Sequence, residues 1–498
     1  MPRAVTMNSP EKIRGLPAGA RIALLVMFMN VGSMHCTREA RLENPCDAES
    51  TAGLALLSTA CGGLAVDGST GGSGDSGSGD SGSGSGDAGG TQQYTIGVSL
   101  SYLSGSGLTL LNNGGDALNP AADGSFNFAT SVADGAAYNV TVGTQPTSPR
   151  EYCHVISGSG TVSAANVTGV QVYCFQLPDS GQTQCTQDAD ARGSFSTCPQ
   201  TVTGQDGDYV DTPAAYAPAF HDAGETVLEA SSGLIWQRCT RGQTGTDCSG
   251  GSVSGATQAT AVSYCDSLSL AGRTWRLPTA RELLLMSDYQ EQQPAANTTV
   301  FTNQPSTGNY WSSTASVPGG AGQYWYLQID TGDLAYTSGA SSFNVRCVSG
   351  PSMPASSFAD NGDGTVTDAV TSLMWTKCAM NSPGAPHANT TTCAGSNDED
   401  KFEVVIGGCE GMSYAGHTDW RLPSIRELAT LVDFSANSAP YIDTTFFPNT
   451  GTSPTYAAST SEKQQNNRAW GIRFNTGTPT VHAKMGTDFA SRCVRSTP

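Results

Sequence analysis

The sequence predicts a mostly β protein in which a β-sandwich is followed by two tandem α+β modules. Glycine is frequent, with 59 residues in a chain of 498, whereas charged residues make up only 13%, and this composition is typical of turn-rich extracellular β domains. Short alternating runs separated by Gly, Asn and Asp occupy residues 92–175, which indicates a sandwich. An eight-residue stretch then occurs twice with similar flanks, so the second half of the chain contains a duplicated module.

Residues 1–61 have the features of an export segment. Basic residues precede an apolar run at 22–29, which has the length of a signal-peptide core and is too short to span a bilayer. A second apolar run leads to Cys61 within the sequence STACG, which resembles a bacterial lipoprotein cleavage site. Lipidation of Cys61 would leave an even number of cysteines after it. Residues 62–91, rich in Gly, Ser and Asp, are then expected to form a flexible linker.

The cysteines, the net charge and the histidines limit the function classes. No C-x-x-C occurs, which opposes zinc ribbons and thioredoxin-like redox sites, and twelve paired cysteines after Cys61 fit an oxidising compartment. The net charge of −19 opposes binding to nucleic acid or another polyanion through simple charge attraction. The six histidines form no cluster with cysteines or acids in the sequence, so neither a zinc centre nor a Ser-His-Asp triad is expected.

Residues 92–175 are expected to form a small β-sandwich that serves as a spacer. The phrases LTLLNNGGDAL, GSFNFAT and YNVTVGTQP resemble an immunoglobulin-like module of bacterial surface proteins, which implies no ligand for this part. Cys153 is expected to pair with Cys174. A connector, residues 176–210, follows, and in it Cys185 and Cys198 are expected to close a short loop.

The repeated stretch reads WRLPTARE at 275–282 and WRLPSIRE at 420–427. Its Trp-Arg-Leu-Pro half cannot continue a helix because proline breaks the pattern. Thr279 and Ser424 then stand as N-caps, with Glu282 and Glu427 three residues later, and this spacing predicts a capping box at the start of a helix in each copy.

The modules around this stretch are copy one, residues 211–350, and copy two, residues 357–498. Before the stretch, apolar residues at spacings of three predict a helix through Cys265 in copy one, whereas Gly407 and Gly408 weaken the equivalent helix of copy two. Each copy holds four cysteines in the same order, so pairing within a copy is the simplest rule. The rule gives four expected disulfides: Cys239–Cys248, Cys265–Cys347, Cys378–Cys393 and Cys409–Cys493.

The order of these features resembles the Lcl C-terminal domain family, named from a bacterial collagen-like adhesin. The matching segments are GLIWQRC at 233–239, SLMWTKC at 372–378, the two WRLP stretches, YWSST at 310–314, and the closing VRCV and SRCV. The RLPT…E and RCV segments are also similar to the formylglycine-generating-enzyme branch of C-type-lectin-like folds. The resemblance implies two tandem C-type-lectin-like domains, surface display and adhesion to a glycan, matrix or protein ligand, and it implies no reaction.

Four aromatic residues of copy one are a candidate ligand surface. Tyr310, Trp311, Trp325 and Tyr326 either form a platform on which a sugar stacks or belong to the core of a β-rich domain. Neighbouring strand residues face opposite sides, so one of Trp325 and Tyr326 is expected at the surface. Copy two has alanine and glycine where copy one has Trp311 and Tyr326, and ligand binding is therefore expected mainly on copy one.

A candidate metal site lies near the start of copy two. Hard oxygen ligands at alternate positions suit calcium, although the segment lacks the final bidentate Glu of an EF-hand loop. The Asn-Gly-Asp-Gly sequence is also a good hairpin turn, so a calcium loop and a plain turn both remain open. The residues concerned are Asp360, Asn361, Asp363 and Asp368.

The two arginines of the repeated stretch, Arg276 and Arg421, are expected to pair with carboxylates inside the fold. Asp288 and Asp433, which follow the stretch in each copy, are the expected partners. An ion pair of this kind would make both arginines part of the scaffold rather than of a ligand site.

These observations favour an exported cell-surface lipoprotein of the outer membrane with a binding role toward glycan or matrix ligands. One alternative is an enzyme of the formylglycine-generating type, which needs free reactive thiols, and another is a purely structural envelope protein. Calcium is the one cofactor considered, and no nucleic-acid partner is expected.

Overall fold

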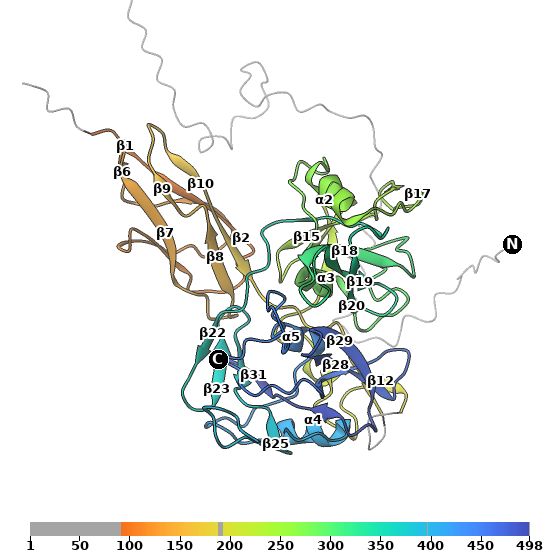
Figure 1. The fold of residues 1–498 in the computed structure, drawn as a ribbon. Coiled ribbons are helices and arrows are strands. Elements are labelled where there is room, and N and C mark those ends of the chain that lie inside the picture. The colour runs from red at the N-terminus through yellow and green to blue at the C-terminus, as the bar shows by residue number, and fades with distance from the viewer. Residues whose placement is uncertain (1–90, 188–192, 396, 498) are drawn as a thin grey trace, which may run out of the picture. The chain divides into compact units, whose positions relative to one another are not determined.

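The computed structural model describes residues 91–187, 193–395 and 397–497, and Figure 1 shows their helices and strands. The export segment, the linker up to residue 90 and the lipidation position Cys61 lie outside the described residues. The fold is mostly β, with several small sheets and few short helices. Among the described residues, no helix has the length and apolar character needed to cross a membrane.

Residues 92–175 form two four-stranded sheets around one hydrophobic core. Strands β2, β7 and β10 supply most of this core, including Val98, Val140 and Val172. One sheet contains, in order, β5 (Gly124–Asn127), β2 (Ile96–Ser101), β10 (Val167–Phe175) and β8 (Tyr152–Ile156). The other contains β4 (Asp116–Leu118), β3 (Thr109–Asn112), β7 (Ala137–Thr144) and β9 (Ser159–Thr161), and a short pair joins β1 (Gln93–Tyr94) to β6 (Val132–Ala133).

The connector contains β11 (Gln184–Thr186), β12 (Phe195–Thr197) and the 3-10 turn η2 (Asp206–Tyr209). It contacts copy one, where the carbonyl of Ser180 accepts from the N–H of Tyr289 at 3.0 Å, and it also packs against copy two. The side chain of Gln182 donates to the carbonyl of Ser461 and accepts from its N–H, both at 2.9 Å. The connector therefore completes the surface of a domain that begins about 150 residues later in the chain.

Copy one consists of two antiparallel sheets and two helices. The first sheet contains β13 (Pro218–His221), β14 (Thr226–Glu229), β15 (Leu234–Gln237) and β21 (Val348–Ser349), and η3 (Asp222–Gly224) follows β13. The second contains β18 (Asn309–Ala315), β19 (Gln323–Gln328) and β20 (Asp333–Ser338). The helices are α2 (Gln258–Asp266) and α3 (Ala280–Met286), and a small hairpin joins β16 (Gln243–Thr244) to β17 (Gly250–Gly251).

Copy two repeats this arrangement with small changes. Its first sheet contains β22 (Phe358–Asp360), β23 (Thr365–Asp368), β24 (Leu373–Thr376) and β31 (Val494–Ser496). Its second contains β29 (Thr478–Ala483), β28 (Arg468–Arg473), β27 (Thr455–Ser461) and β30 (Phe489–Ala490), where β30 runs parallel to β27. The helices are α4 (Phe402–Glu410), which forms despite its two glycines, and α5 (Ile425–Ala429), and an added hairpin joins β25 (Met380–Ser382) to β26 (Ala385–Pro386).

The predicted capping boxes are present at both helix starts. In α3 the hydroxyl of Thr279 accepts from the N–H of Glu282, and the carboxylate of Glu282 accepts from the N–H of Thr279. Ser424 and Glu427 repeat this exchange in α5. Proline before each N-cap keeps the chain extended, so the helix begins at the same position in both copies.

The six predicted disulfides are also present. Two of them link a helix to the last strand region of the same copy, across 82 and 84 residues, and each sulfur bridge lies in the hydrophobic core of its copy. The full set is Cys153–Cys174, Cys185–Cys198, Cys239–Cys248, Cys265–Cys347, Cys378–Cys393 and Cys409–Cys493.

Besides the core of each copy, one hydrophobic core is shared by both copies. Helix α3 lies against α5, and β20 lies against β29. A single cluster of buried residues contains Leu283 and Leu327 of copy one together with Leu428 and Ile472 of copy two. The tandem copies therefore bury part of their apolar surface against each other, which stabilises them as one unit.

Candidate functional site

The arginines of the repeated stretch pair with the capping-box glutamates, so the predicted partners Asp288 and Asp433 are wrong. Arg421 donates two hydrogen bonds to Glu427, at 2.5 and 2.6 Å, and Arg276 donates two to Glu282, both at 2.7 Å. Each glutamate thus caps a helix and neutralises an arginine at the same time.

Burial differs between these two ion pairs. Both glutamate side chains are fully buried, whereas the arginine side chain is 6% exposed for Arg421 and 26% exposed for Arg276. Burial opposes ionisation of Glu282, but the hydrogen bonds and the charge of Arg276 outweigh this effect and hold the pKa of its carboxyl below the usual value. These groups are paired inside the scaffold and are not offered to a ligand.

The two aspartates lie apart from the arginines. Asp288 is buried and accepts from the N–H of Gln290 at 3.0 Å, and burial raises the pKa of its carboxyl to about 6. Asp433 accepts from the N–H and hydroxyl of Ser435. Both carboxylates therefore hold local turns.

Three of the four aromatic candidates are core residues, so the core alternative is correct for them and the alternative of a stacking platform on copy one is wrong. Tyr310 and Trp311 are 0% exposed and Trp325 is 1% exposed. Trp311 packs on Phe343 at 4.5 Å between ring centroids and donates its indole N–H to the carbonyl of Ala256. A sugar cannot reach these rings because they are buried. Buried aromatic rings of this size stabilise the core of a β-rich module.

Only Tyr326 reaches the surface, and it is half-buried. Its ring packs against Trp311 and Phe343, and burial raises the pKa of its hydroxyl. The expectation that one of Trp325 and Tyr326 faces outward is therefore correct for Tyr326. Trp325 faces the other way and packs on Phe434 of copy two at 5.3 Å.

Asp360, Asn361 and Asp363 lie at the hairpin turn between β22 and β23, whereas Asp368 is the last residue of β23. Asp360 is paired with Lys377 at 2.6 Å, and Asp363 accepts from the N–H and hydroxyl of Thr365. Asp368 is fully buried and accepts from the N–H groups of Ser357 and Val370.

The side-chain amide of Asn361 donates to Thr365 and Thr367. Within the described ranges, the carboxylates of Asp360, Asp363 and Asp368 do not come together within 4.8 Å of one another. The turn alternative accounts for these residues, and the residues present do not fit a calcium site.

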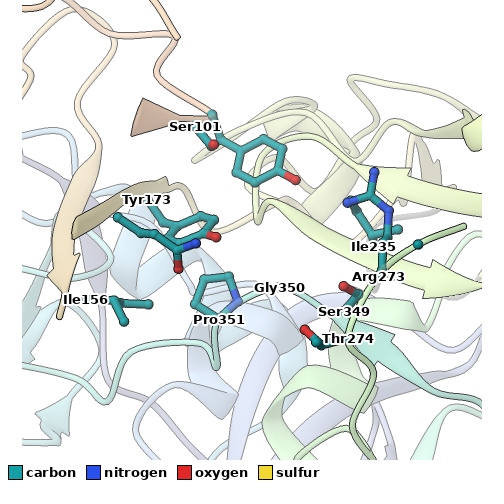
Figure 2. Close-up of a pocket in the computed structure, with 12 residues that line it drawn as sticks. Ser101, Ile156, Tyr173, Ile235, Arg273, Thr274, Ser349, Gly350 and Pro351 are labelled. Atoms are coloured by element: carbon teal, nitrogen blue, oxygen red, sulfur yellow. The ribbon is translucent and has the colours of Figure 1, made fainter. Parts of the chain in front are cut away.

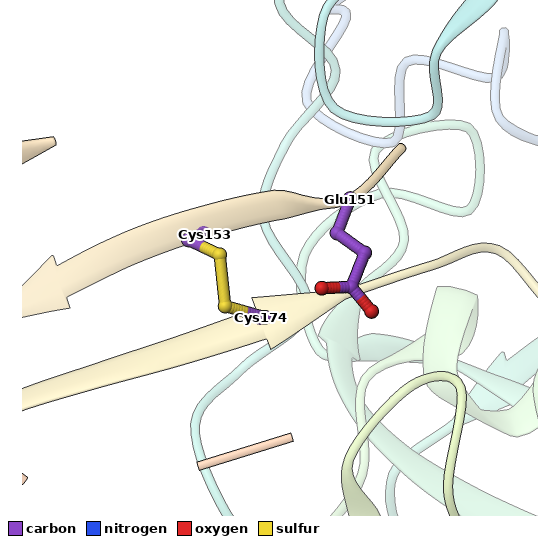
Figure 3. Close-up of side chains that lie close together, drawn as sticks. All are labelled: Glu151, Cys153 and Cys174. Carbon is purple, nitrogen blue, oxygen red and sulfur yellow. A yellow bond between two sulfur atoms is a disulfide. The ribbon is translucent and has the colours of Figure 1, made fainter. Parts of the chain in front are cut away.

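Two groups of acidic and sulfur-bearing side chains do come together within 4.8 Å in the described part of the chain. Figure 3 shows one of them, in which the carboxylate of Glu151 lies beside the Cys153–Cys174 disulfide. The other joins Asp208 to the Cys185–Cys198 disulfide. Cysteines in a disulfide offer no thiolate to a metal, and Glu151 already accepts from the N–H of Gly105. Neither group has the donors of a metal site.

One arrangement in copy two has the order of a hydrolytic triad. His482 lies 2.8 Å from Asp488 and 3.1 Å from the hydroxyl of Thr455. Thr455 is fully buried and its hydroxyl also accepts from Arg473 at 3.2 Å. A nucleophile must be reachable by substrate, so these residues serve to hold β27 and β29 together.

Two arginines at equivalent positions of the repeated stretch join the copies. Arg281 of copy one donates to the carbonyls of Thr430 and Val432, which end the helical turn of copy two, at 3.5 and 3.2 Å. Arg426 of copy two donates to the carbonyl of Leu285 at 3.0 Å.

Arg426 also donates to the carbonyls of Ser287 and, in the connector, Asp179. It is 2% exposed and lies over the ring of Tyr216 at 4.2 Å. Arginine at a helix C-terminus satisfies carbonyls that have no partner within the helix. The repeated stretch therefore builds an interface between the copies as well as a helix start.

A buried carboxyl of the connector was not predicted from the sequence. Asp206 is 4% exposed and accepts from the hydroxyl of Ser180 at 2.5 Å and from that of Thr460 in copy two. Burial raises the pKa of this carboxyl to about 7. No sequence signal marked it, because Gly-Gln-Asp-Gly-Asp-Tyr has the composition of an exposed turn.

An opening of about 510 Å³ is lined by residues that include Tyr173, Arg273 and Pro351 (Figure 2). The guanidinium of Arg273 is held by Asp222 at 2.6 and 2.9 Å, and this pair lowers the pKa of the Asp222 carboxyl. The one charged side chain of the opening is therefore already neutralised, and it gives no charge to a ligand.

A cleft of about 360 Å³ lies within copy one, between the C-terminal part of α2 and the loop closed by the Cys239–Cys248 disulfide. Its lining residues are Glu225, Gln237, Cys239, Gln243, Thr244, Gly245, Thr246, Tyr264, Leu268 and Leu270. We refer to it as the copy-one cleft. One sequence difference could have indicated the cleft. The residue before the helix cysteine is Tyr264 in copy one and Gly408 in copy two.

A family model, the Lcl C-terminal domain, matches residues 225–349 and 364–495. No curated protein matches the chain. Each matched segment begins just before the second strand of its copy, ends in the last strand and includes the repeated stretch.

Proposed function

The chain belongs to the Lcl C-terminal domain family, with two copies in tandem, and from this premise we propose that it is an exported binding protein for an extracellular glycan or matrix ligand. The six disulfides indicate an oxidising, extracytoplasmic location. Display at the cell surface through a lipid on Cys61 is part of the proposal, as is the C-type-lectin-like character of each copy.

The observation on which the proposal rests is that the cysteines and the arginine–glutamate pairs of the described ranges are bonded to one another inside the fold. Every cysteine of the described ranges is in a disulfide, and the arginine–glutamate pairs are closed within each copy. Chemistry of the formylglycine-generating type needs a free thiolate, so this state of the cysteines supports binding rather than that reaction.

Two further features support a neutral ligand. The net charge is −19, which disfavours anionic ligands such as sulfated polymers through repulsion at long range. The copy-one cleft remains open, with aromatic, apolar and hydroxyl-bearing side chains on its walls, and such a mixture is typical of sites for small uncharged ligands.

The test uses the full chain on an array of neutral and sulfated glycans and matrix proteins, together with a count of free thiols on the folded protein. We expect binding to neutral glycans or to a matrix protein, little loss of signal at high salt, and no free thiol in residues 92–498. A blank array would favour a purely structural envelope protein. A free thiol in either copy would favour the enzyme.

A further inference from the structure

The copy-one cleft has the size and the walls of a site for one small ligand. Its volume of about 360 Å³ lies within the range of small-molecule pockets, about 300–1,000 Å³. Tyr264, Leu268 and Leu270 give it an apolar wall, and the disulfide loop gives it a polar one with the hydroxyls of Thr244 and Thr246. This pairing of an apolar face with a hydroxyl-rich face matches the two faces of a sugar ring.

A buried amide fixes the aromatic ring of the cleft. Gln237 is 6% exposed, donates to the hydroxyl of Tyr264 at 2.8 Å and accepts from the N–H of Cys347 at 3.2 Å. Arg241 lies over the Tyr264 ring at 5.4 Å but does not line the cleft. Because the Tyr264 hydroxyl receives a hydrogen bond from Gln237, its own proton is directed to another acceptor, and none is found among the described residues.

The charge of the cleft selects among ligand chemistries. No Lys, Arg or His lines it, and its one carboxylate belongs to Glu225. Glu225 is exposed, and within the described ranges its carboxylate has no partner. A phosphate, sulfate or carboxylate would meet the negative charge of Glu225, and no cationic side chain among the lining residues compensates it. A carboxylate with free lone pairs accepts well from adjacent hydroxyl groups of a neutral ligand.

The same region of copy two is filled by the chain itself. Gly408 stands before Cys409 as Tyr264 stands before Cys265. The two cysteines of the loop disulfide are 15 positions apart in the sequence there instead of 9. The β25–β26 hairpin of this loop packs on α4 so closely that a Cβ at Gly408 would lie 2.8 Å from the nitrogen of Gly384. The duplication therefore leaves this surface covered in copy two and open in copy one.

We propose that the copy-one cleft binds one neutral sugar unit, with its apolar face on Tyr264 and Leu270 and its hydroxyls toward Glu225 and the disulfide loop. This inference deepens the proposed function and rests on it. It assigns sugar binding to copy one, through residues other than the buried Tyr310, Trp311 and Trp325. Copy two then contributes to stability through the hydrophobic core that it shares with copy one.

The test measures binding of the methyl glycosides of glucose, galactose, mannose and N-acetylglucosamine to the full chain by saturation-transfer NMR. We expect at least one to bind. Thr246→Trp places a bulky side chain at an exposed position of the cleft and is expected to weaken binding about tenfold or more, since a filled pocket loses its ligand contacts. Thr298→Trp, at an exposed position of copy one outside the cleft, is the matched control and is expected to change nothing.

Two milder variants keep the inference testable if Thr246→Trp disturbs the loop. Tyr264→Phe keeps the ring and removes the hydroxyl, and Glu225→Gln removes the charge. Each is expected to weaken binding several-fold through loss of one hydrogen bond, while Glu291→Gln, an exposed acid of copy one outside the cleft, is expected to have no effect.

The outcomes separate the two proposals. Equal binding by the Thr246→Trp, Tyr264→Phe and unaltered proteins would place the sugar elsewhere and overturn the cleft, while the proposed function stands. N-acetyl-lysine amide, a cationic probe for Glu225, and a sulfated methyl glycoside, an anionic probe, are measured in the same experiment. Preference for either of them over every neutral glycoside would also overturn the cleft. A blank array of glycans and matrix proteins would remove the proposed function itself.

Discussion

Tyr289 of copy one meets Trp470 of copy two edge to face, with ring centroids 5.3 Å apart and an interplanar angle of 81°. The same contact occurs with the copies exchanged, between Phe434 and Trp325, at 5.3 Å and 83°. Each copy therefore contributes the same two positions to the interface. A symmetric homodimer builds such a contact between two subunits, and here one chain builds it from its own duplication.

The interface arginines give the first prediction. Arg426→Ala is expected to lower the free energy of unfolding by roughly 3 kcal/mol or more. The buried carbonyl groups that accept hydrogen bonds from the Arg426 guanidinium would lose their charged donor in the variant. Arg281→Ala is expected to cost less, roughly 1–2 kcal/mol, because its bonds are longer and it is only partly buried. Denaturant unfolding of both variants measures the difference. A larger loss for Arg281→Ala would contradict the interface described here.

The arginine–glutamate pairs give the second prediction. Arg421→Ala is expected to cost about 3–5 kcal/mol, because it leaves the buried carboxylate of Glu427 without its partner. Arg276→Ala is expected to cost less, since the Arg276 side chain is 26% exposed rather than 6%. Thermal unfolding and array binding are measured side by side. An unchanged melting temperature with abolished binding would show that these arginines belong to a ligand site.

The long disulfides give the third prediction. Replacing Cys265 and Cys347 together by alanine is expected to lower stability by up to about 4 kcal/mol in the chain-entropy model for a loop of this length. The Cys409/Cys493 pair closes a loop of nearly equal length, 84 against 82 residues, and is expected to match it. Non-reducing peptide mapping of the unaltered protein checks the pairing, and a cross-link between copies would refute it.

The carboxyl of Asp206 gives a prediction for pH. Its pKa in the folded protein, about 7, is above that of an unfolded aspartate, near 4. Between these values the folded state keeps a proton that the unfolded chain has released, so the free energy of unfolding falls as the pH rises from about 4 to about 7. Asp206→Asn is expected to reduce this fall by roughly 1–3 kcal/mol.

Urea unfolding at several pH values measures the slope. The carboxyl pKa values of Asp288 and Asp333 are also raised, to about 6, so the slope should decrease without disappearing. Asp266→Asn, at an exposed position of α2, serves as the control. A slope that is the same for Asp206→Asn and the unaltered chain would show that Asp206 does not hold its proton in the folded state.

The connector gives the fifth prediction. A fragment of residues 176–498 is expected to be more stable than a fragment of residues 211–498, by roughly 3 kcal/mol or more, because the shorter one loses the buried hydrogen bonds that Gln182 and Asp206 make to copy two. Melting temperatures of the two fragments measure this. Identical values would show that copy two is complete without the connector.

Local features of the candidate site followed from the sequence, and distant ones did not. The capping boxes were predicted because Thr279 and Glu282 are three residues apart and interact within one turn. The partner of Arg276 was missed because the Glu282 carboxylate was assigned to the cap alone, whereas it serves both groups.

The role of Trp325 shows the limit more clearly. Strand alternation shows that one side of β19 is buried, but it does not say what covers that side. The cover is Phe434, which lies more than 100 residues later in the sequence. An aromatic residue can be buried against the other copy as completely as within its own copy. Sequence composition does not distinguish a buried aromatic residue of either kind from one that forms a binding platform.

The position of the connector also bears on the order in which the chain folds. Gln182 and Ser461 are 279 residues apart, and Thr186 and Lys484 are 298 apart. Contacts of such long sequence separation form slowly, because a large loop must close before they stabilise anything. Because the chain is synthesised from its amino terminus, the connector leaves the ribosome well before the part of copy two that it contacts. Copy two therefore reaches its final form only when the carboxyl-terminal strands have emerged, and until then the polar side chains of the connector remain hydrated.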